Sequence, residues 1–332
     1  LGIKGFPMGH IRQFMSRHYL HFNARETRLA AEAYCSHLDQ GGQMLVTLAG
    51  AMSTGELGIS LARMIREKKV HAISCTGANL EEDIFNLLAH GDYEVIDNWR
   101  GLSPEEEEQL YNRGMNRVTD TCIPEDVMRN VEDVLVGLWQ SACESGKRKF
   151  PSEFLFQALQ TPGMIDDYQI NPEDSWVLAA IEAEIPVYTP GWEDSTMGNI
   201  FVANIVKGRV KDHSCVRSGT EQFQHLLEWY IEQTIGNPPH SSVGLFQVGG
   251  GIAGDFAICA VPCLVQDLKE DVPAWGYFAQ ITDSTPSYGG YSGALPEEKI
   301  TWGKITKTTP YFSINSDASI VAPLVFSYIL DD

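Results

Sequence analysis

Residues 43–83 read QMLVTLAGAMSTGELGISLARMIREKKVHAISCTGANLEED, and this stretch decides the fold. The apolar run at 43–50 predicts a buried parallel strand, and apolar residues within 57–65 then recur at helical spacing. A second strand is predicted at 70–75, followed by a polar turn and a helix that opens at 80–83. A strand, a turn of small polar residues and a helix, repeated in this order, predict a doubly wound α/β domain with a mostly parallel sheet.

The two turns of this stretch, residues 49–55 and 76–79, follow the carboxyl ends of predicted strands. Ligands of open α/β sheets bind at these ends, and the helix N-termini there favour phosphate groups. A strict G-x-G-x-x-G pattern is absent. On the pattern alone, a nucleotide site and ordinary packing turns are equally good interpretations.

The remaining chain extends the same architecture. Residues 1–40 show helical spacing, with Asn23 as a possible cap between two helices, and predict an N-terminal helical arm. No linker rich in Pro, Gly and Ser divides residues 41–332, which we expect to form a single domain. Further strands are predicted at 116–121, 185–190, 243–248, 277–281 and 311–315, and further helices at 223–235 and after 316–319.

Composition excludes several classes of function. The 332-residue chain has a formal net charge of −20, which argues against nucleic acid or an anionic membrane as a partner and suits small cations. Seven cysteines without a C-x-x-C pair, and no signal-peptide pattern, lead us to expect a cytoplasmic protein with reduced thiols. No apolar run is long enough for a membrane span, and no histidine spacing predicts a metal site.

The sequence GGYSGALPEEKITWGKI at 289–305 is the strongest candidate for chemistry. It joins a glycine-rich turn to adjacent carboxylates, to Trp302 and to Lys304. An aromatic ring can cover a cationic ligand, and a lysine kept from water is a potential nucleophile towards a carbonyl or an imine. The alternative is a surface loop with a solvated lysine, which is the usual meaning of an isolated W-G-K.

This segment resembles the active-site segment of deoxyhypusine synthase and its relatives. The resemblance runs from about residue 40 to the end, through L-E-E-D at 80–83, D-x-x-x-G at 194–198, G-G-G at 249–251, the W-G-K segment and S-D-A-S at 316–319. It implies a Rossmann-like fold, NAD as the cofactor and a homotetramer with active sites between paired subunits. It also implies transfer of an aminoalkyl group from a polyamine through a lysine imine.

The resemblance assigns roles to individual residues. Lys304 matches the imine-forming lysine, and Trp302 and Glu298 match residues that cover and pair with the polyamine. Glu81 and Glu82 match an acidic pair near cofactor and substrate. The matched cofactor contacts are Ser53, Thr76, Gly77, Asp194, Gly250, Asp283, Ser316 and Asp317.

Three positions depart from the family pattern. Asn199 and Tyr291 stand where the family has aspartates, and Asp255 aligns with a histidine. Two anionic partners for the ends of spermidine are therefore missing, and a buried ammonium without a partner costs several kcal/mol. We therefore expect Asn199, Asp255 and Tyr291 to define an altered substrate site, as in the bacterial deoxyhypusine synthase-like subgroup.

Three hypotheses follow for the function. The first is an NAD-dependent aminoalkyl transferase that acts on polyamine-like or guanidino-amine small molecules. The second is a true deoxyhypusine synthase that modifies a translation factor lysine. The third is a non-catalytic regulator that binds NAD or polyamine.

Overall fold

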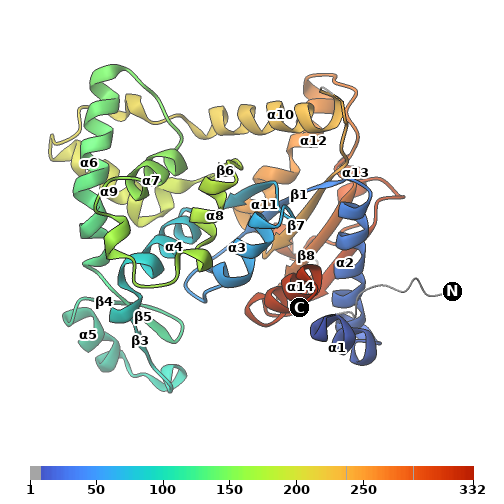
Figure 1. Ribbon diagram of the computed structural model, residues 1–332, viewed down its shortest axis with the longest axis horizontal. Helices are drawn as coiled ribbons and strands as arrows, with labels where there is room; N and C mark the ends of the chain where they lie inside the picture. The colour runs from blue at the N-terminus through green and yellow to red at the C-terminus, as the bar shows by residue number, and fades with distance from the viewer. Residues whose placement is uncertain (1–8, 237, 287) are drawn as a thin grey trace.

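A six-stranded parallel sheet forms the centre of the computed structural model, which describes residues 9–236, 238–286 and 288–332 (Figure 1). Its strands are β1 (Gln43–Leu48), β2 (Ala72–Cys75), β6 (Val187–Tyr188), β7 (Val243–Val248), β8 (Tyr277–Thr282) and β9 (Tyr311–Asn315). Their spatial order is β6-β2-β1-β7-β8-β9, and every pairing is parallel. The chain thus winds outward from β1 in one direction and from β7 in the other. The predicted doubly wound, Rossmann-like α/β fold is confirmed, and the crevice for a ligand is expected where β1 and β7 end.

Helices cover both faces of this sheet. They are α1 (His10–His18), α2 (Phe22–Asp39), α3 (Gly58–Arg66), α4 (Gly77–Ala89), α5 (Pro104–Asn112), α6 (Val127–Ser145), α7 (Pro151–Leu159), α8 (Trp176–Glu182), α9 (Thr196–Val206), α10 (Gly219–Ile235), α11 (Gly251–Ile258), α12 (Ala260–Pro262), α13 (Glu298–Thr301) and α14 (Ala318–Leu330). Side chains of a strand alternate between its two faces. Met44 and Val46 therefore join the core beneath α2 and α14, while Leu45 and Leu245 join the core beneath α10 and α11.

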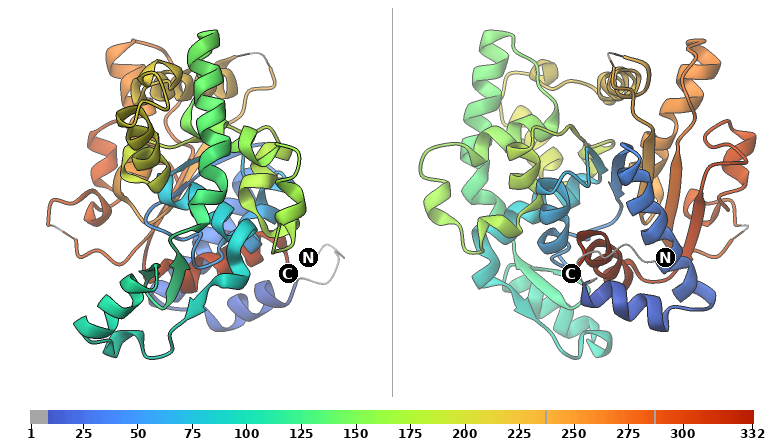
Figure 2. Two further views of the ribbon diagram at one scale, coloured as in Figure 1. Left: turned by 90° about the vertical axis from the view of Figure 1, so that its left-hand side faces the viewer. Right: turned by 45° about the vertical axis from the view of Figure 1, so that its right-hand side comes forward.

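The N-terminal helices lie against the end of the chain. α2 packs on β8, β9 and α14, and Tyr34 of α2 is fully buried. The amide of Ile11 donates to the carbonyl of Asp332 (2.7 Å), so α1 lies next to the C-terminus (Figure 2). Residues 1–8 of the predicted arm lie outside the described residues. The prediction of Asn23 as a cap between two helices is wrong. Asn23 lies within α2, and its side-chain amide donates to the carbonyl of Asn315 (2.8 Å).

A second, three-stranded sheet corrects the prediction for residues 116–121. β4 (Met115–Val118) and β5 (Thr121–Pro124) pair antiparallel, and β3 (Glu94–Val95) pairs with β5. The chain reverses at Thr119, which has a left-handed φ of 53°. A single strand was therefore the wrong interpretation, because a two-residue turn can close a hairpin there. This sheet and α5 lie at the lower left of Figure 1, away from the central sheet.

β6 is shorter than the predicted strand at 185–190. Only Val187 and Tyr188 pair with β2. Pro186 and Pro190 flank the pair, and proline has no N–H to offer a sheet ladder. In the part of the chain that the structure describes, no helix combines the length and apolar character that crossing a bilayer requires.

Candidate functional site

The first candidate site is a pocket of about 610 Å³, here called the lysine pocket. It lies between the N-terminal part of α10, helices α11 and α12, and the segment 289–304. The residues predicted to act on the substrate that line it are Asp255, Tyr291, Glu298, Trp302 and Lys304. The structure therefore brings the W-G-K segment together with α11, from which Asp255 comes.

Lys304 is buried in this pocket, with 8% of its surface exposed. Its Nζ donates to Asp255 Oδ1 at 3.3 Å. The same atom lies 5.6 Å from the ring centre of Tyr291 and 5.8 Å from that of Trp302. Trp302 itself is 64% exposed, so its ring covers the amine on the solvent side. The amine is held by a carboxylate and two aromatic faces, largely out of contact with bulk water.

The loop that carries Tyr291 is fixed by polar side chains of the sheet. Gln247 of β7 donates from Nε2 to Tyr291 Oη (2.6 Å), and Gln280 of β8 donates to the carbonyl of Ser292 (2.8 Å). Gln247 and Gln280 are register partners on neighbouring strands. Burial raises the pKa of Tyr291 well above its ordinary value. Tyr291 is therefore neutral at pH 7 and brings no negative charge to the lysine pocket.

Lys299 is a second lysine of this pocket, and sequence reasoning missed it. It is 3% exposed, and its Nζ donates to the carbonyl of Ala294 (3.1 Å). Its ammonium group lies over the rings of Phe278 (4.9 Å) and Tyr291 (5.3 Å). Burial, and then the nearby Lys304, lower the pKa of Lys299 to about 8. In the sequence Lys299 looks like an ordinary helical lysine, and only its position five residues before Lys304 connects it with the candidate site.

The second candidate site, here called the switch-point pocket, is a hollow of about 400 Å³ at the carboxyl ends of β1 and β2. Three predicted cofactor residues, Thr76, Gly77 and Asp194, line it. Thr76 caps α4 by accepting from the amide of Asn79 (3.2 Å). The N-terminus of α4 therefore borders the pocket, as a phosphate site at a helix N-terminus requires.

Asn79 holds the turn after β1 and was not singled out from the sequence. Its side chain is fully buried and donates to the carbonyl of Gly50 (2.8 Å) and to Thr76 Oγ1 (2.8 Å). Its Oδ1 accepts from the amide of Ser53 (3.0 Å). One side chain thus ties the turns after β1 and β2 together. An asparagine in a turn is common, and only its distant partners distinguish this one.

Two glycines of the predicted cofactor set are sterically required. A Cβ on Gly77 would lie 2.5 Å from Ser195 Cβ, where the loop carrying Asp194 crosses α4. A Cβ on Gly250 would lie 2.1 Å from Ser292 Oγ. Both positions bring two backbone segments into close approach, which only glycine permits.

Helix α11 forms a wall of both pockets. Ile252 lines the switch-point pocket, and Asp255, almost one turn later, lines the lysine pocket. The helix begins at Gly251, directly after β7. The two candidate sites are therefore neighbours across a single helix.

Other predicted residues lie outside these two pockets. Ser53 is buried, and its hydroxyl accepts from Trp176 Nε1 (3.0 Å). Asn199 lies within α9 and donates to the carbonyl of Ser195 (2.7 Å). The remaining cofactor candidates lie beyond the carboxyl ends of β7, β8 and β9: Gly250, Asp283, Ser316 and Asp317.

The acidic pair Glu81 and Glu82 lines a different cavity, of about 140 Å³, next to β4 and β5. Glu81 accepts from the amides of Thr196 (2.9 Å) and Met197 (2.8 Å), which begin α9. Glu82 accepts from the hydroxyl of Thr54. Glu81 thus caps α9, and the pair does not line the lysine pocket.

Glu82→Gln is expected to stabilise the protein at pH 8 more than at pH 5. Burial raises the pKa of Glu82 from 4.5 to about 7. The folded state therefore binds this proton more tightly than the unfolded state, and the stability that it contributes is lost as the pH rises through about 7. At 1.36 kcal/mol per pKa unit, the gain in unfolding free energy at pH 8 is on the order of 3 kcal/mol.

Urea unfolding at pH 5 and pH 8 measures this gain, with the exposed Glu108→Gln as the matched control. An unfolding free energy at pH 8 equal to that of the unsubstituted protein would contradict the assignment of Glu82 as a buried, destabilising charge.

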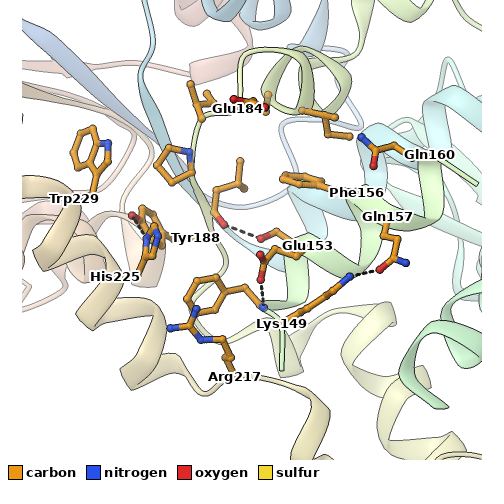
Figure 3. A pocket seen from close by; sticks show the side chains of 17 residues that line it. Lys149, Glu153, Phe156, Gln157, Gln160, Glu184, Tyr188, Arg217, His225 and Trp229 are labelled. Atoms are coloured by element: carbon orange, nitrogen blue, oxygen red, sulfur yellow. Dashed lines mark hydrogen bonds between the residues drawn. The ribbon is translucent and has the colours of Figure 1, made fainter. Parts of the chain in front are cut away.

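Another pocket, of about 850 Å³, lies between α7, β6 and α10 (Figure 3). Tyr188 Oη and His225 Nδ1 are 2.9 Å apart on one wall, and Lys149 and Arg217 lie near its rim. None of the residues that the sequence singled out lines it.

Comparison with known proteins decides the family. A family model for deoxyhypusine synthase matches residues 13–329. The chain belongs to the deoxyhypusine synthase family. Membership in this family implies a transferase.

Relatives in this family are distant. The "Probable deoxyhypusine synthase 2" of Methanosarcina mazei is 26% identical over 309 residues, which cover 92% of this chain and 81% of that protein. The "Deoxyhypusine synthase-like protein" of Chlorobaculum parvum is 25% identical over 311 residues, which cover 92% of this chain and 82% of that protein. A solved structure described as "Crystal Structure of a putative deoxyhypusine synthase from Entamoeba histolytica" matches with a TM-score of 0.58 at 12% identity, covering 98% of this chain and 96% of that one. At this identity the structural likeness concerns the fold alone.

Proposed function

We propose that this protein is an NAD-dependent aminoalkyl transferase that acts on small amines through an imine on Lys304. The observation that carries the proposal is the buried Lys304 amine, 3.3 Å from Asp255, in a pocket separated by one helix from the switch-point pocket. Family membership supports the reaction type.

The residues of the switch-point pocket suit a dinucleotide. The N-terminus of α4 offers backbone N–H groups to a phosphate, and Gly77 leaves room for a close approach. The exposed carboxylate of Asp194 suits the hydroxyl groups of a ribose. NAD, when bound, would supply the acceptor for a hydride from the substrate amine.

The chain's own residues would perform the transfer. The free amine of Lys304 adds to the oxidised carbon of the donor, the original amine leaves, and an acceptor amine then displaces Lys304. Return of the hydride to the resulting acceptor imine would give the product amine and restore the starting redox state. Asp255 lies at hydrogen-bonding distance and can take the proton that Lys304 loses when it attacks. Trp302 covers the mouth of the pocket and excludes water, which would otherwise hydrolyse the imine.

A small-molecule acceptor is favoured by the altered substrate positions. Tyr291 is a neutral side chain in the lysine pocket, and Asn199 is uncharged and outside it. Polyamine-like or guanidino-amine molecules are therefore proposed in place of the translation factor lysine of a true deoxyhypusine synthase. The cytoplasm remains the proposed location.

A homotetramer with sites between paired subunits is also proposed. Asp283, Ser316 and Asp317 lie at the carboxyl edge of the sheet but outside the switch-point pocket of their own subunit. These residues, together with Glu81 or Glu82, would then contribute to an active site shared with a neighbouring subunit. Light scattering of the purified protein tests the assembly, and a monomer at working concentration contradicts it.

Borohydride trapping tests the chemistry. The protein is incubated with NAD and, separately, with putrescine, spermidine and agmatine, and is then reduced and mapped by mass spectrometry. We expect a stable adduct on the Lys304 peptide with at least one amine and none without NAD. The absence of an adduct with every amine, together with measurable NAD binding, would favour the non-catalytic regulator.

Adding the translation factor precursor with spermidine separates the remaining hypothesis. Transfer to a lysine of that protein, with no transfer to small amines, identifies a true deoxyhypusine synthase. Transfer to putrescine or agmatine supports the proposal.

A further inference from the structure

The charge arrangement of the lysine pocket carries one further inference, which rests on the proposed function. Two lysines and three acids line the pocket: Lys299, Lys304, Asp255, Asp267 and Glu298. Lys304 and Asp255 form an ion pair at 3.3 Å. Asp267 and Glu298 are exposed carboxylates on the wall and suit cationic groups of a substrate. In the described part of the chain Lys299 makes no ion pair with any of these carboxylates, and the charges of Glu298 and Asp255 act on it only from beyond ion-pair distance.

Lys299 has the features of an unfilled anion site. It is 97% shielded from solvent, since only 3% of its surface is exposed. An ammonium group has three N–H donors, and within the described residues that of Lys299 makes a single hydrogen bond, to the carbonyl of Ala294. Among residues 9–236, 238–286 and 288–332, it forms no ion pair. A buried ammonium group without a carboxylate at ion-pair distance is costly, and an anion that contacts it directly would reduce this cost.

The aromatic rings beside Lys299 do not replace a counterion. Phe278 and Tyr291 present their faces at 4.9 and 5.3 Å, which offers the ammonium a weak attraction. Tyr291 is neutral, and its hydroxyl is already bonded to Gln247. Tyr291 thus stands where an acid would have competed for Lys299.

We propose that Lys299 binds a carboxylate of the substrate, and that the pocket takes an amine that also carries a carboxylate, such as a diamino acid or a guanidino amino acid. The ammonium or guanidinium end of such a molecule meets Glu298 and Asp267, and its carboxylate meets the two remaining N–H donors of Lys299. Lys299 is then a specificity-determining residue, and Lys304 remains the nucleophile.

Matched pairs of ligands test this assignment without requiring turnover. Ornithine differs from putrescine by one carboxylate, and arginine differs from agmatine in the same way. Calorimetric titration of the full-length protein with NAD present at pH 7 gives the affinity of each. We expect the carboxylated member of at least one pair to bind about 10-fold more tightly than its partner, as for one good charge-assisted contact.

Lys299→Met should reduce the ratio of affinities within a ligand pair from about 10 to about 1, while Lys299→Arg should retain most of the preference. Putrescine affinity and the thermal midpoint of Lys299→Met check that the pocket is intact. If Lys299→Met does not fold, raising the pH of the unsubstituted protein from 7 to 9 provides the second measurement. The preference for the carboxylated ligand should shrink as Lys299 loses its proton. The charged groups that face Lys299 are Lys304, Asp255, Glu297 and Glu298.

The proposal is overturned if the unsubstituted protein binds both carboxylated members no better than their partners. An undiminished preference in folded Lys299→Met also overturns it. These results are independent of imine chemistry, because an adduct on Lys304 with putrescine would support the transferase even if no carboxylate were recognised.

Discussion

Lys304→Ala should abolish the borohydride adduct and reduce aminoalkyl transfer by at least about 10³-fold, since it removes the covalent nucleophile. The side chain points into the lysine pocket and makes one hydrogen bond, to Asp255. Its removal should therefore leave NAD binding at the switch-point pocket within about 2-fold of the starting value, which is a free-energy change of about 0.4 kcal/mol. Steady-state rates and NAD titration measure the two effects.

Lys307→Ala is the matched control, because Lys307 is exposed and lies three residues further along the chain. It should keep full activity and the adduct. An adduct that persists in Lys304→Ala, for instance on Lys299, would show that the nucleophile is misassigned.

Asn79→Ala should have the largest effect on the cofactor site. The substitution removes the Asn79 side chain as a partner of the Ser53 amide and of the Ala49 carbonyl, while the Thr76 hydroxyl still donates to the carbonyl of Gly50. At about 1–3 kcal/mol for each buried group left unsatisfied, and with partial relaxation, we expect a loss of roughly 3 kcal/mol in unfolding free energy. The turn that borders the switch-point pocket should also loosen, and NAD affinity should fall at least about 10-fold.

Denaturant unfolding and NAD titration follow the two effects, with the exposed Asn112→Ala as the control. Normal NAD affinity in a destabilised Asn79→Ala would show that this turn does not take part in cofactor binding.

The sequence was informative wherever the signal is local. The period of apolar residues in 43–83 predicted the strands and helices that now form the centre of the sheet, because burial on both faces imposes that pattern. The W-G-K segment predicted a buried lysine, and Lys304 is indeed buried. The helix predicted after 316–319 also had a local signal, and Asp317 caps it by accepting from the amide of Ser319 (2.7 Å).

The sequence was uninformative where a role depends on distant partners. Lys299 is an ordinary helical lysine until Phe278 and Tyr291 close over it. The acidic run that contains Glu81 resembles a ligand site, but its partners on α9 are more than a hundred residues away. The hairpin of β4 and β5 was missed because its turn lacks the Asn-Gly or Gly-Gly signal, and the left-handed conformation falls on Thr119.

Helix α11 has a consequence for how the family can diversify. This helix separates the switch-point pocket from the lysine pocket. The first is built from the first half of the chain and the 190–194 loop, and the second mainly from residues 255–304. Under the proposed function, the redox compartment and the substrate compartment are encoded by separate parts of the gene. Changes such as Tyr291 and Lys299 can retarget the second compartment while leaving the first untouched, so new amine chemistries can arise by substitution on one side of α11 alone.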